Sequence, residues 1–244
     1  MIQHTAASEA ISLNPAMPAA SGMTQGRLVG AGLLVSFFLG MYSNFQLQSD
    51  LFSNGGYMVQ AGQHPWLIGT IVVLGLVTGL IYLAIAATVR QRMAAQMPVL
   101  SLCYLLLVTA GFAMNQVEHT VLLTMRPISE AFLAAGPEAA AKFELVRELL
   151  SGLRNGIHFP DKLVGGLSVF LLFFLLKRAR VIPPALALAG MVAAVCQMST
   201  ILRQLFGYDI IYALLAPLAL VYPATGIWLL IHGFAAKESA QPMR

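Results

Sequence analysis

Glu118 and His119 are adjacent residues whose side chains are suited to acid–base chemistry. A carboxyl group and an imidazole transfer protons when their surroundings are tuned for it. Asp209 is a second candidate proton donor. A carboxylic acid kept neutral by desolvation protonates a double bond or an epoxide. These three candidate catalytic residues therefore define an enzyme hypothesis: acid–base isomerisation or cyclisation of a lipid or isoprenoid within the membrane.

A larger set of polar residues is suited to binding a molecule. Arginine holds a carboxylate or phosphate through two parallel hydrogen bonds, and amides both donate and accept. The candidate ligand-binding residues are Asn44, Asn115, Gln116, Arg154, His158, Gln197 and Arg203. The favoured function is binding of an amphipathic small molecule or a membrane lipid, with the enzyme as the alternative. A third hypothesis is an accessory subunit of a membrane complex.

Metal and cofactor chemistry has little support in the pattern. His64, His119 and His158 are the histidines that a haem or metal site would use. The chain has no HExxH motif, glycine-rich phosphate loop, GxSxG motif or paired acidic motif that would preset a site. We therefore expect no metal and no cofactor, and no motif fixes a reaction.

The elements that position these residues are apolar. The chain of 244 residues is 58% hydrophobic and 10% charged, whereas a soluble domain carries about 25% charged residues. Six apolar segments run from 27 to 45, 66 to 89, 97 to 117, 159 to 176, 183 to 201 and 210 to 234. Each is close to the roughly 20 residues that cross a bilayer as a helix. The predicted fold is an all-α bundle of six transmembrane helices.

The predicted domain spans residues 27–236, between a disordered cytoplasmic tail over 1–26 and a second cytoplasmic tail over 237–244. Basic residues in the short loops set the orientation: Arg90, Arg92, Lys177, Arg178 and Arg180. By the positive-inside rule these loops and both termini face the cytoplasm of a bacterial inner (plasma) membrane. The same residues explain the pI of about 9.3 without a nucleic-acid partner.

The long connection from Glu118 to His158 is then extracytoplasmic. Within it, Gly136-Pro137 is typical of a helix start, and Phe143, Val146, Leu150 and Leu153 recur at helical spacing. This pattern predicts an amphipathic helix that lies on the membrane or caps the bundle. A helix packed on the loop itself is the alternative.

All six predicted helices carry polar residues at their extracytoplasmic ends, while the cytoplasmic halves are almost purely apolar. Charges and amides inside the hydrocarbon face the bundle interior and pair with one another or with a ligand. We therefore expect a polar cavity open to the extracytoplasmic side. The alternative is an ordinary interfacial role, which we favour for Asp50, His64 and Asp209.

Gly75 and Gly79 have the spacing of a close helix contact, which indicates packing and is also compatible with a homo-oligomer. The segments RLVGAGLL from Arg27, LVGGLSVFLLFFLLKRARVIPPALALAG from Leu163 and DIIYALLAPLALVYPATGIWLLIHGF from Asp209 resemble a bacterial six-helix membrane family. It is numbered 4386 among domains of unknown function. The resemblance covers residues 27–234. It implies the fold and topology, and it transfers no catalytic residue or substrate.

Overall fold

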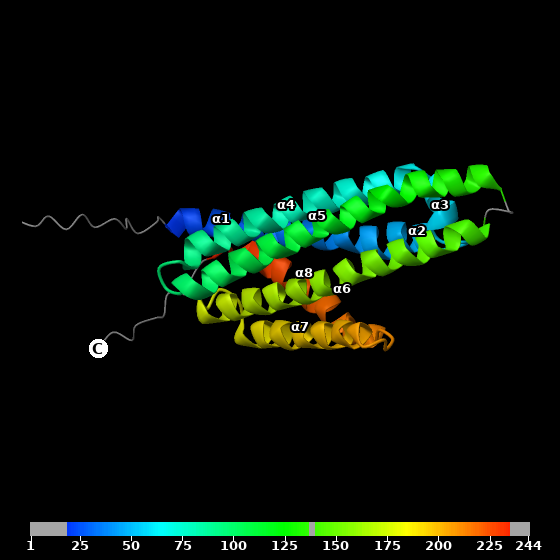
Figure 1. Cartoon of the computed structure of the whole chain (residues 1–244). Coiled ribbons are helices and arrows are strands. Elements are labelled where there is room, and N and C mark those ends of the chain that lie inside the picture. Colours follow the sequence, from blue (N-terminus) through cyan, green and yellow to red (C-terminus); the bar gives the residue numbers. More distant parts are fainter. Residues whose placement is uncertain (1–18, 137–139, 235–244) are drawn as a thin grey trace, which may run out of the picture.

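The computed structural model describes residues 19–136 and 140–234, and the described chain is helical throughout with no strand (Figure 1). The elements are α1 (Ala19–Tyr42), η1 (Ser43–Leu47), α2 (Gln48–Phe52), α3 (Tyr57–Gln63), α4 (Trp66–Met93), α5 (Pro98–Ala135), α6 (Ala140–Arg178), α7 (Pro184–Leu205), η3 (Tyr212–Leu214) and α8 (Ala216–His232). Six helical segments are long and apolar enough to cross a membrane. The all-α, six-helix prediction is confirmed.

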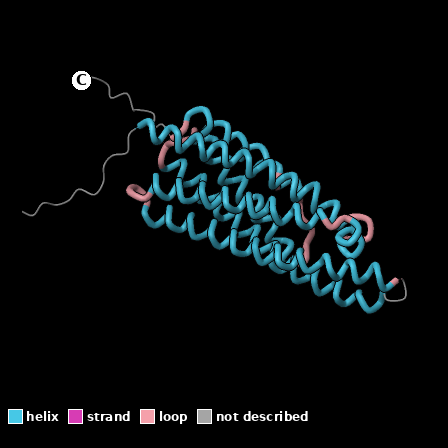
Figure 2. The backbone as a smooth tube through the Cα atoms, turned by 90° about the horizontal axis from the view of Figure 1, so that it is seen from above, coloured by secondary structure: helices cyan, strands magenta, loops and turns pink. Residues whose placement is uncertain are grey.

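The six long helices form a closed ring. α1 packs on α4 and α8, and α5, α6 and α7 complete the circuit between them, so every long helix contacts its two neighbours. Figure 2 shows these helices running side by side with short connections. The backbone N–H of Phe234 donates to the carbonyl of Gly22 at 3.2 Å. The two ends of the described chain therefore lie together at one end of the ring.

Proline and glycine mark several helix ends. Pro98 and Pro184 occupy the first turns of α5 and α7, where a missing N–H has no consequence. Gly136 follows α5 with φ of 74°, and Gly233 follows α8 with φ of 62°. Because other residues rarely adopt positive φ, glycine at these two positions ends each helix.

The long connection predicted between residues 118 and 158 is not a loop. α5 continues well past the predicted end at Val117, and α6 already begins at Ala140. The predicted amphipathic helix is therefore the first part of α6 rather than a separate element. Phe143 and Val146 pack against the buried cluster to which α5 contributes Val121, Leu122 and Met125. The apolar stripes of α5 and α6 bury each other there, so both helices continue without a bilayer to cover their apolar faces.

Some predicted boundaries differ from the observed ones, and others lie outside the described residues. α1 begins at Ala19, inside the segment 1–26 that was assigned to a tail. Residues 1–18 and 235–244 lie outside the description, as does most of the predicted helix start at 136–138. Leu153, the last residue of the predicted stripe, is half exposed.

α5 and α6 are much longer than a bilayer requires. Their 38 and 39 residues correspond to about 57 Å of helix at 1.5 Å per residue, against about 30 Å of hydrocarbon. α7 has only 22 residues, so α5 and α6 extend past its end (Figure 1). We call α3 together with residues 119–135 of α5 and 140–157 of α6 the projecting lobe.

Within the projecting lobe, hydrogen bonds fix α3 to α5 and α6. The Ser129 hydroxyl of α5 donates to the Met58 carbonyl at 2.8 Å and accepts from the Gly62 N–H at 2.8 Å. The Tyr57 hydroxyl donates to the Arg147 carbonyl of α6 at 3.1 Å. Burial raises the pKa of Tyr57 above its ordinary value, which keeps the hydroxyl protonated as that bond requires. α3 therefore joins α5 to α6 inside the lobe.

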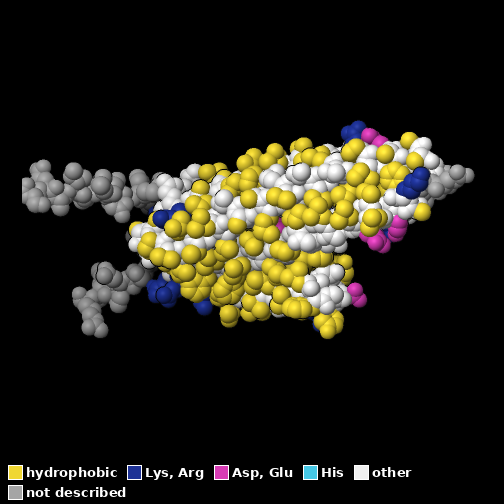
Figure 3. Space-filling view, in the orientation of Figure 1, with side chains coloured by type: hydrophobic (Ala, Val, Ile, Leu, Met, Phe, Trp, Pro, Cys, Tyr) yellow, Lys and Arg dark blue, Asp and Glu magenta, His cyan; other side chains and the backbone are white. Residues whose placement is uncertain are grey.

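The surface divides into three zones. Figure 3 shows Lys and Arg at the end where the described termini lie, an apolar belt along the helices, and charges of both signs on the projecting lobe. The basic end carries Arg90, Arg92, Lys177 and Arg178 in the last turns of α4 and α6. This distribution is that of a multi-pass membrane protein.

Glycines bring the helices close within the belt. A Cβ at Gly30 of α1 would lie 2.5 Å from the Leu230 nitrogen of α8. A Cβ at Gly79 of α4 would lie 2.4 Å from the Phe112 ring of α5, and one at Gly75 would lie 2.3 Å from His119. The packing role predicted for Gly75 and Gly79 is confirmed.

Candidate functional site

Glu118 is the centre of a buried set of polar side chains. Its carboxylate comes from α5 and is almost completely buried. From α6, the Arg154 Nε donates to Glu118 Oε1 at 3.1 Å, and His158 Nδ1 lies 2.9 Å from the same oxygen. Arg154 and His158 are one helical turn apart, so both side chains face α5. A buried carboxylate is stable only when it is paired in this way.

The N-terminal helix extends this network. Arg154 Nη2 donates to Gln48 Oε1 of α2, and the guanidinium lies 4.8 Å from the centre of the Phe52 ring. Gln48 Nε2 donates to Asn44 Oδ1 at 3.1 Å. We call Asn44, Gln48, Glu118, Arg154 and His158 the polar network. It connects three segments that are far apart in the sequence.

A local irregularity lies in this part of the chain. Residues Ser43–Leu47 form a π-helical turn, η1, between α1 and α2. Such turns insert a residue into a helix, rotate the side chains that follow, and are frequent at functional sites. η1 contains Asn44 and directly precedes Gln48. Asn44 was among the predicted binding residues, and Gln48 was not.

A second ion pair follows one turn later on α6. Lys162 Nζ donates to Asp161 Oδ2 at 2.8 Å. Asp161 is buried where Gly111 of α5 leaves room for it, with Oδ1 at 3.6 Å from the position of a Cβ. The exposed fractions of the side chains rise along α6 from 14% for Arg154 to 16% for His158 and 28% for Lys162.

Arg154, His158 and Lys162 of α6 lie near the level at which α7 ends while α5 and α6 continue. Gly166 of α6 faces Met198 of α7. Because the two helices are antiparallel, the end of α7 at Leu205 is near the level of Phe159 of α6. Figure 3 shows the resulting step between the projecting lobe and the shorter end of the ring. The partly accessible residues of α6 are therefore located at this step.

The structure does not bring the predicted catalytic residues together. His119 points away from Glu118, as consecutive residues of a helix do, and its buried ring packs against Gly75 of α4. The histidine that contacts Glu118 is His158. Asp209 is exposed in the turn after α7. There its backbone carbonyl accepts a hydrogen bond from Arg203 Nε at 3.5 Å.

The remaining predicted binding residues are dispersed around the ring. Asn115 faces α4, with Oδ1 3.3 Å from the position of a Gly75 Cβ. Arg203 is exposed and lies over the Tyr208 ring. Four buried side-chain atoms have no hydrogen-bond partner within the described part of the chain: Gln25 Oε1, Gln116 Nε2, His119 Nδ1 and Gln197 Oε1. The predicted set therefore divides into a connected network, unpartnered interior atoms and surface residues.

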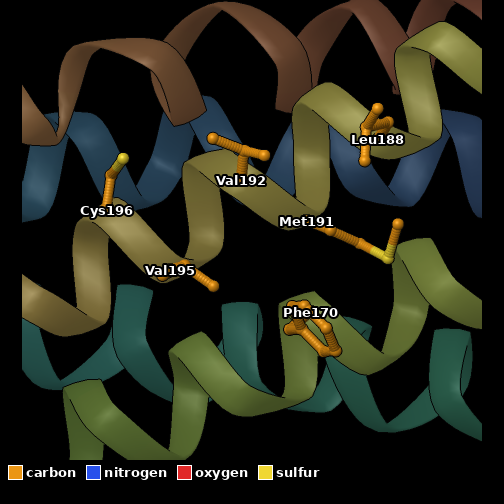
Figure 4. Close-up of a pocket in the computed structure, with 6 residues that line it drawn as sticks. All are labelled: Phe170, Leu188, Met191, Val192, Val195 and Cys196. Atoms are coloured by element: carbon orange, nitrogen blue, oxygen red, sulfur yellow. The ribbon is translucent and has the colours of Figure 1, made fainter.

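Two pockets lie outside the polar network. An apolar groove of about 360 Å³ lies between α6 and α7. Figure 4 shows the side chains that line it: Phe170, Leu188, Met191, Val192, Val195 and Cys196. A second pocket of about 270 Å³ lies in the projecting lobe beside Phe132, Phe143 and Arg147. Among the described residues, no group of three His, Cys, Asp or Glu side chains is placed to hold a metal ion. His64 is exposed at the end of α3.

A hydroxyl cluster in the middle of the ring was missed by the sequence analysis. The buried Tyr222 side chain of α8 lies close to Tyr82 of α4, Ser36 of α1 and Tyr104 of α5. Ser36 donates to the Leu33 carbonyl at 3.2 Å. The cluster lies in spans that were expected to be almost purely apolar. The available signal was the tyrosines themselves, since a buried tyrosine hydroxyl needs a partner.

The fold and the site define the class: a polytopic helical membrane protein with a buried charged network near one end of its ring. The chain belongs to the family described as a domain of unknown function (DUF4386), which matches residues 28–233. The resemblance seen in the sequence is thereby confirmed. No curated protein and no solved structure matches the chain.

Proposed function

We propose that the protein binds an amphipathic small molecule or a lipid, with the polar part of the ligand at the step and the apolar part against the membrane-facing helices. The observation that carries this proposal is an unpartnered interior atom near the step, Gln197 Oε1 on α7. Buried polar atoms in proteins nearly always have a hydrogen-bond partner. A bound polar group would supply partners that the described protein atoms do not.

Accessibility supports the same location. Arg154, His158 and Lys162 are partly exposed although they lie beside the buried Glu118 and Asp161. α6, which carries these residues, also forms one side of the apolar groove in Figure 4. The groove is lined only by apolar side chains and would hold an acyl chain.

Native mass spectrometry of the protein purified in mild detergent tests this proposal. We expect a retained molecule on the native chain, and we expect it to be lost from His158→Leu. The matched control is His64→Leu, which changes an exposed histidine and should keep the ligand. Wild-type preparations that carry no molecule and bind none when lipids are added back would refute the proposal.

One observation favours the alternative, an enzyme acting on a lipid or isoprenoid. Glu118 and His158 form a carboxylate–imidazole contact of 2.9 Å, an arrangement that orients a histidine for proton transfer. In this alternative His158 takes the acid–base role that the sequence suggested for His119. His158→Gln should abolish the cellular product while lipid binding persists. Unchanged product levels would exclude the enzyme.

We also propose that the basic end faces the cytoplasm of a bacterial inner membrane and that the projecting lobe is extracytoplasmic. The support is the concentration of Lys and Arg at the ends of α4 and α6. Thiol labelling of intact cells tests it, with Cys103 and Cys196 first replaced by alanine. An impermeant maleimide should label Glu148→Cys but not Arg92→Cys, and the reverse result would invert the topology.

A further inference from the structure

The charges at the step are balanced within the protein. Two cations, Arg154 and Lys162, are paired with two anions, Glu118 and Asp161, at 3.1 and 2.8 Å. An anionic headgroup bound here would bring a charge with no unpaired cation to receive it. Because an uncompensated charge is costly in a desolvated site, the balance disfavours phosphates and carboxylates.

Arg154 has little capacity left for a ligand. Its Nε donates to Glu118, its Nη2 to Gln48 and its Nη1 to Asn155 Oδ1 at 3.4 Å. Three of the five N–H groups, one on each nitrogen, already donate hydrogen bonds, and one face of the guanidinium lies against Phe52. Bidentate recognition of an anion requires two parallel free N–H groups. Arg154 therefore acts as a support of the network rather than as an anion clamp.

Two hydrogen-bond acceptors are available near the step, on His158 and on Gln197. An ionised Glu118 only accepts hydrogen bonds, so the neutral His158 ring donates from Nδ1 and presents Nε2 as an acceptor. Gln197 Oε1 is a carbonyl-type acceptor and is buried without a partner. Its neighbour Met198 lies against Gly166 of α6, so Gln197 lies about one turn of α6 from Lys162, in the direction of the basic end. His158 lies one turn from Lys162 in the opposite direction.

From this arrangement we infer that the ligand is an uncharged lipid alcohol, whose hydroxyl donates to His158 Nε2 or Gln197 Oε1. This inference rests on the proposed function and adds the chemical class of the polar group. A neutral hydroxyl satisfies the acceptors without disturbing the charge balance. An ester lacks the donor, and a phosphate adds a charge.

Three lipids with identical palmitoyl and oleoyl chains separate these cases: the diacylglycerol, its 3-acetyl ester and the phosphatidic acid. Affinity is measured on the full chain in mild detergent by displacement of a fluorescent diacylglycerol. The diacylglycerol should bind about tenfold or more tightly than either of the others, which corresponds to about one well-formed hydrogen bond. Equal or tighter binding of phosphatidic acid or of the ester would overturn the inference while supporting the proposed function. Binding of none of the three would refute both.

A charge substitution gives an independent test. Asp161→Asn leaves Lys162 without its partner, so affinity for phosphatidic acid should rise about tenfold relative to the wild type. The control is Glu148→Gln, which neutralises an exposed acid on the same helix and should leave the preference unchanged. An Asp161→Asn protein that still rejects phosphatidic acid would overturn the charge-balance argument.

Gln197→Leu tests the acceptor without changing any charge. If Gln197 Oε1 receives the hydroxyl, the diacylglycerol and its acetyl ester should then bind with nearly equal affinity; if His158 Nε2 receives it, the preference should be lost in His158→Leu instead. Gln63→Leu, which removes an exposed amide of α3, should keep the wild-type preference. A tenfold preference that survives both Gln197→Leu and His158→Leu would show that neither atom receives the hydroxyl.

Discussion

α5 contributes to two Glu–Arg ion pairs that differ in their surroundings. The Arg126–Glu130 pair has a distance of 2.8 Å, and both side chains are about half exposed, at 50% and 49%. The Glu118–Arg154 pair is longer at 3.1 Å, and its side chains are 14% exposed for Arg154 and 3% for Glu118. The distance alone would rank the exposed pair as the stronger one. Because of burial, however, breaking the Glu118–Arg154 pair should cost more stability than breaking the Arg126–Glu130 pair.

The difference follows from what remains when one partner is removed. Around Arg126, water and salt solvate the charge that is left, so the loss is small. Around Arg154 there is little water, so removal of Glu118 leaves an uncompensated charge inside the ring. The buried pair therefore holds α5 to α6, whereas the exposed pair only links two residues on one turn of α5.

The largest effect is expected for Glu118→Ala. The substitution strands Arg154 and removes the partner of His158, and it should lower the free energy of unfolding by about 3–5 kcal/mol. Unfolding of the purified protein in detergent, followed by circular dichroism during titration with a denaturing detergent, measures this loss. Glu130→Ala on the same helix is the matched control, with a loss below about 1 kcal/mol. Equal losses for the two variants would show that burial does not distinguish the pairs.

A double substitution separates the stranded charge from the pair itself. Glu118→Leu with Arg154→Met removes both charges and keeps similar volumes. The double variant should recover at least about 2 kcal/mol of the stability lost by Glu118→Ala, because no unpaired charge remains. The same denaturation experiment gives the value. Additive losses would mean that each side chain stabilises the ring by separate contacts.

The glycines allow a similar comparison between a closely packed position and an exposed one. In Gly75→Ala the new Cβ would meet the His119 ring at 2.3 Å, whereas a Cβ at Gly152 of α6 meets nothing within 4 Å. Gly75→Ala should destabilise by about 1–3 kcal/mol through overpacking. Gly152→Ala should be neutral or stabilise by up to about 1 kcal/mol, since alanine favours a helix. Thermal unfolding of both variants tests this, and a destabilised Gly152→Ala would reveal a contact made by another molecule.

The number and approximate positions of the spans could be predicted from the sequence, because lipid requires long apolar helices. The extents of α5 and α6 could not. Residues 118–158 are polar enough to suggest a loop. Only the buried cluster that Val121 and Met125 share, and against which Phe143 packs, shows why they continue the helices. The short apolar stripe of α5 or of α6, taken alone, does not show that the two stripes bury each other.

The site was predictable in composition but not in pairing. Glu118, Arg154 and His158 were selected because charges inside a bundle must face one another. Sequence adjacency favoured His119 as the partner of Glu118, yet residues one apart on a helix point in different directions, and His158 occupies that place. Gln48 was not predicted as a binding residue, although it lies four residues after Asn44 and is hydrogen-bonded to it. Asp209 belongs to an exposed turn, which its position at a helix end already suggested.

The smallest effect concerns the exposed pair and its dependence on salt. Arg126 and Glu130 are spaced i, i+4 on a helix, an arrangement worth about 0.3–0.5 kcal/mol at low ionic strength. At about 1 M salt the screening length falls to about 3 Å, so Glu130→Ala should then cost almost nothing. The cost of Glu118→Ala should change little over the same range, because ions do not reach Arg154. Denaturation of both variants at low and high salt measures the contrast, and a buried-pair cost that collapsed with salt would mean that water and ions enter the polar network.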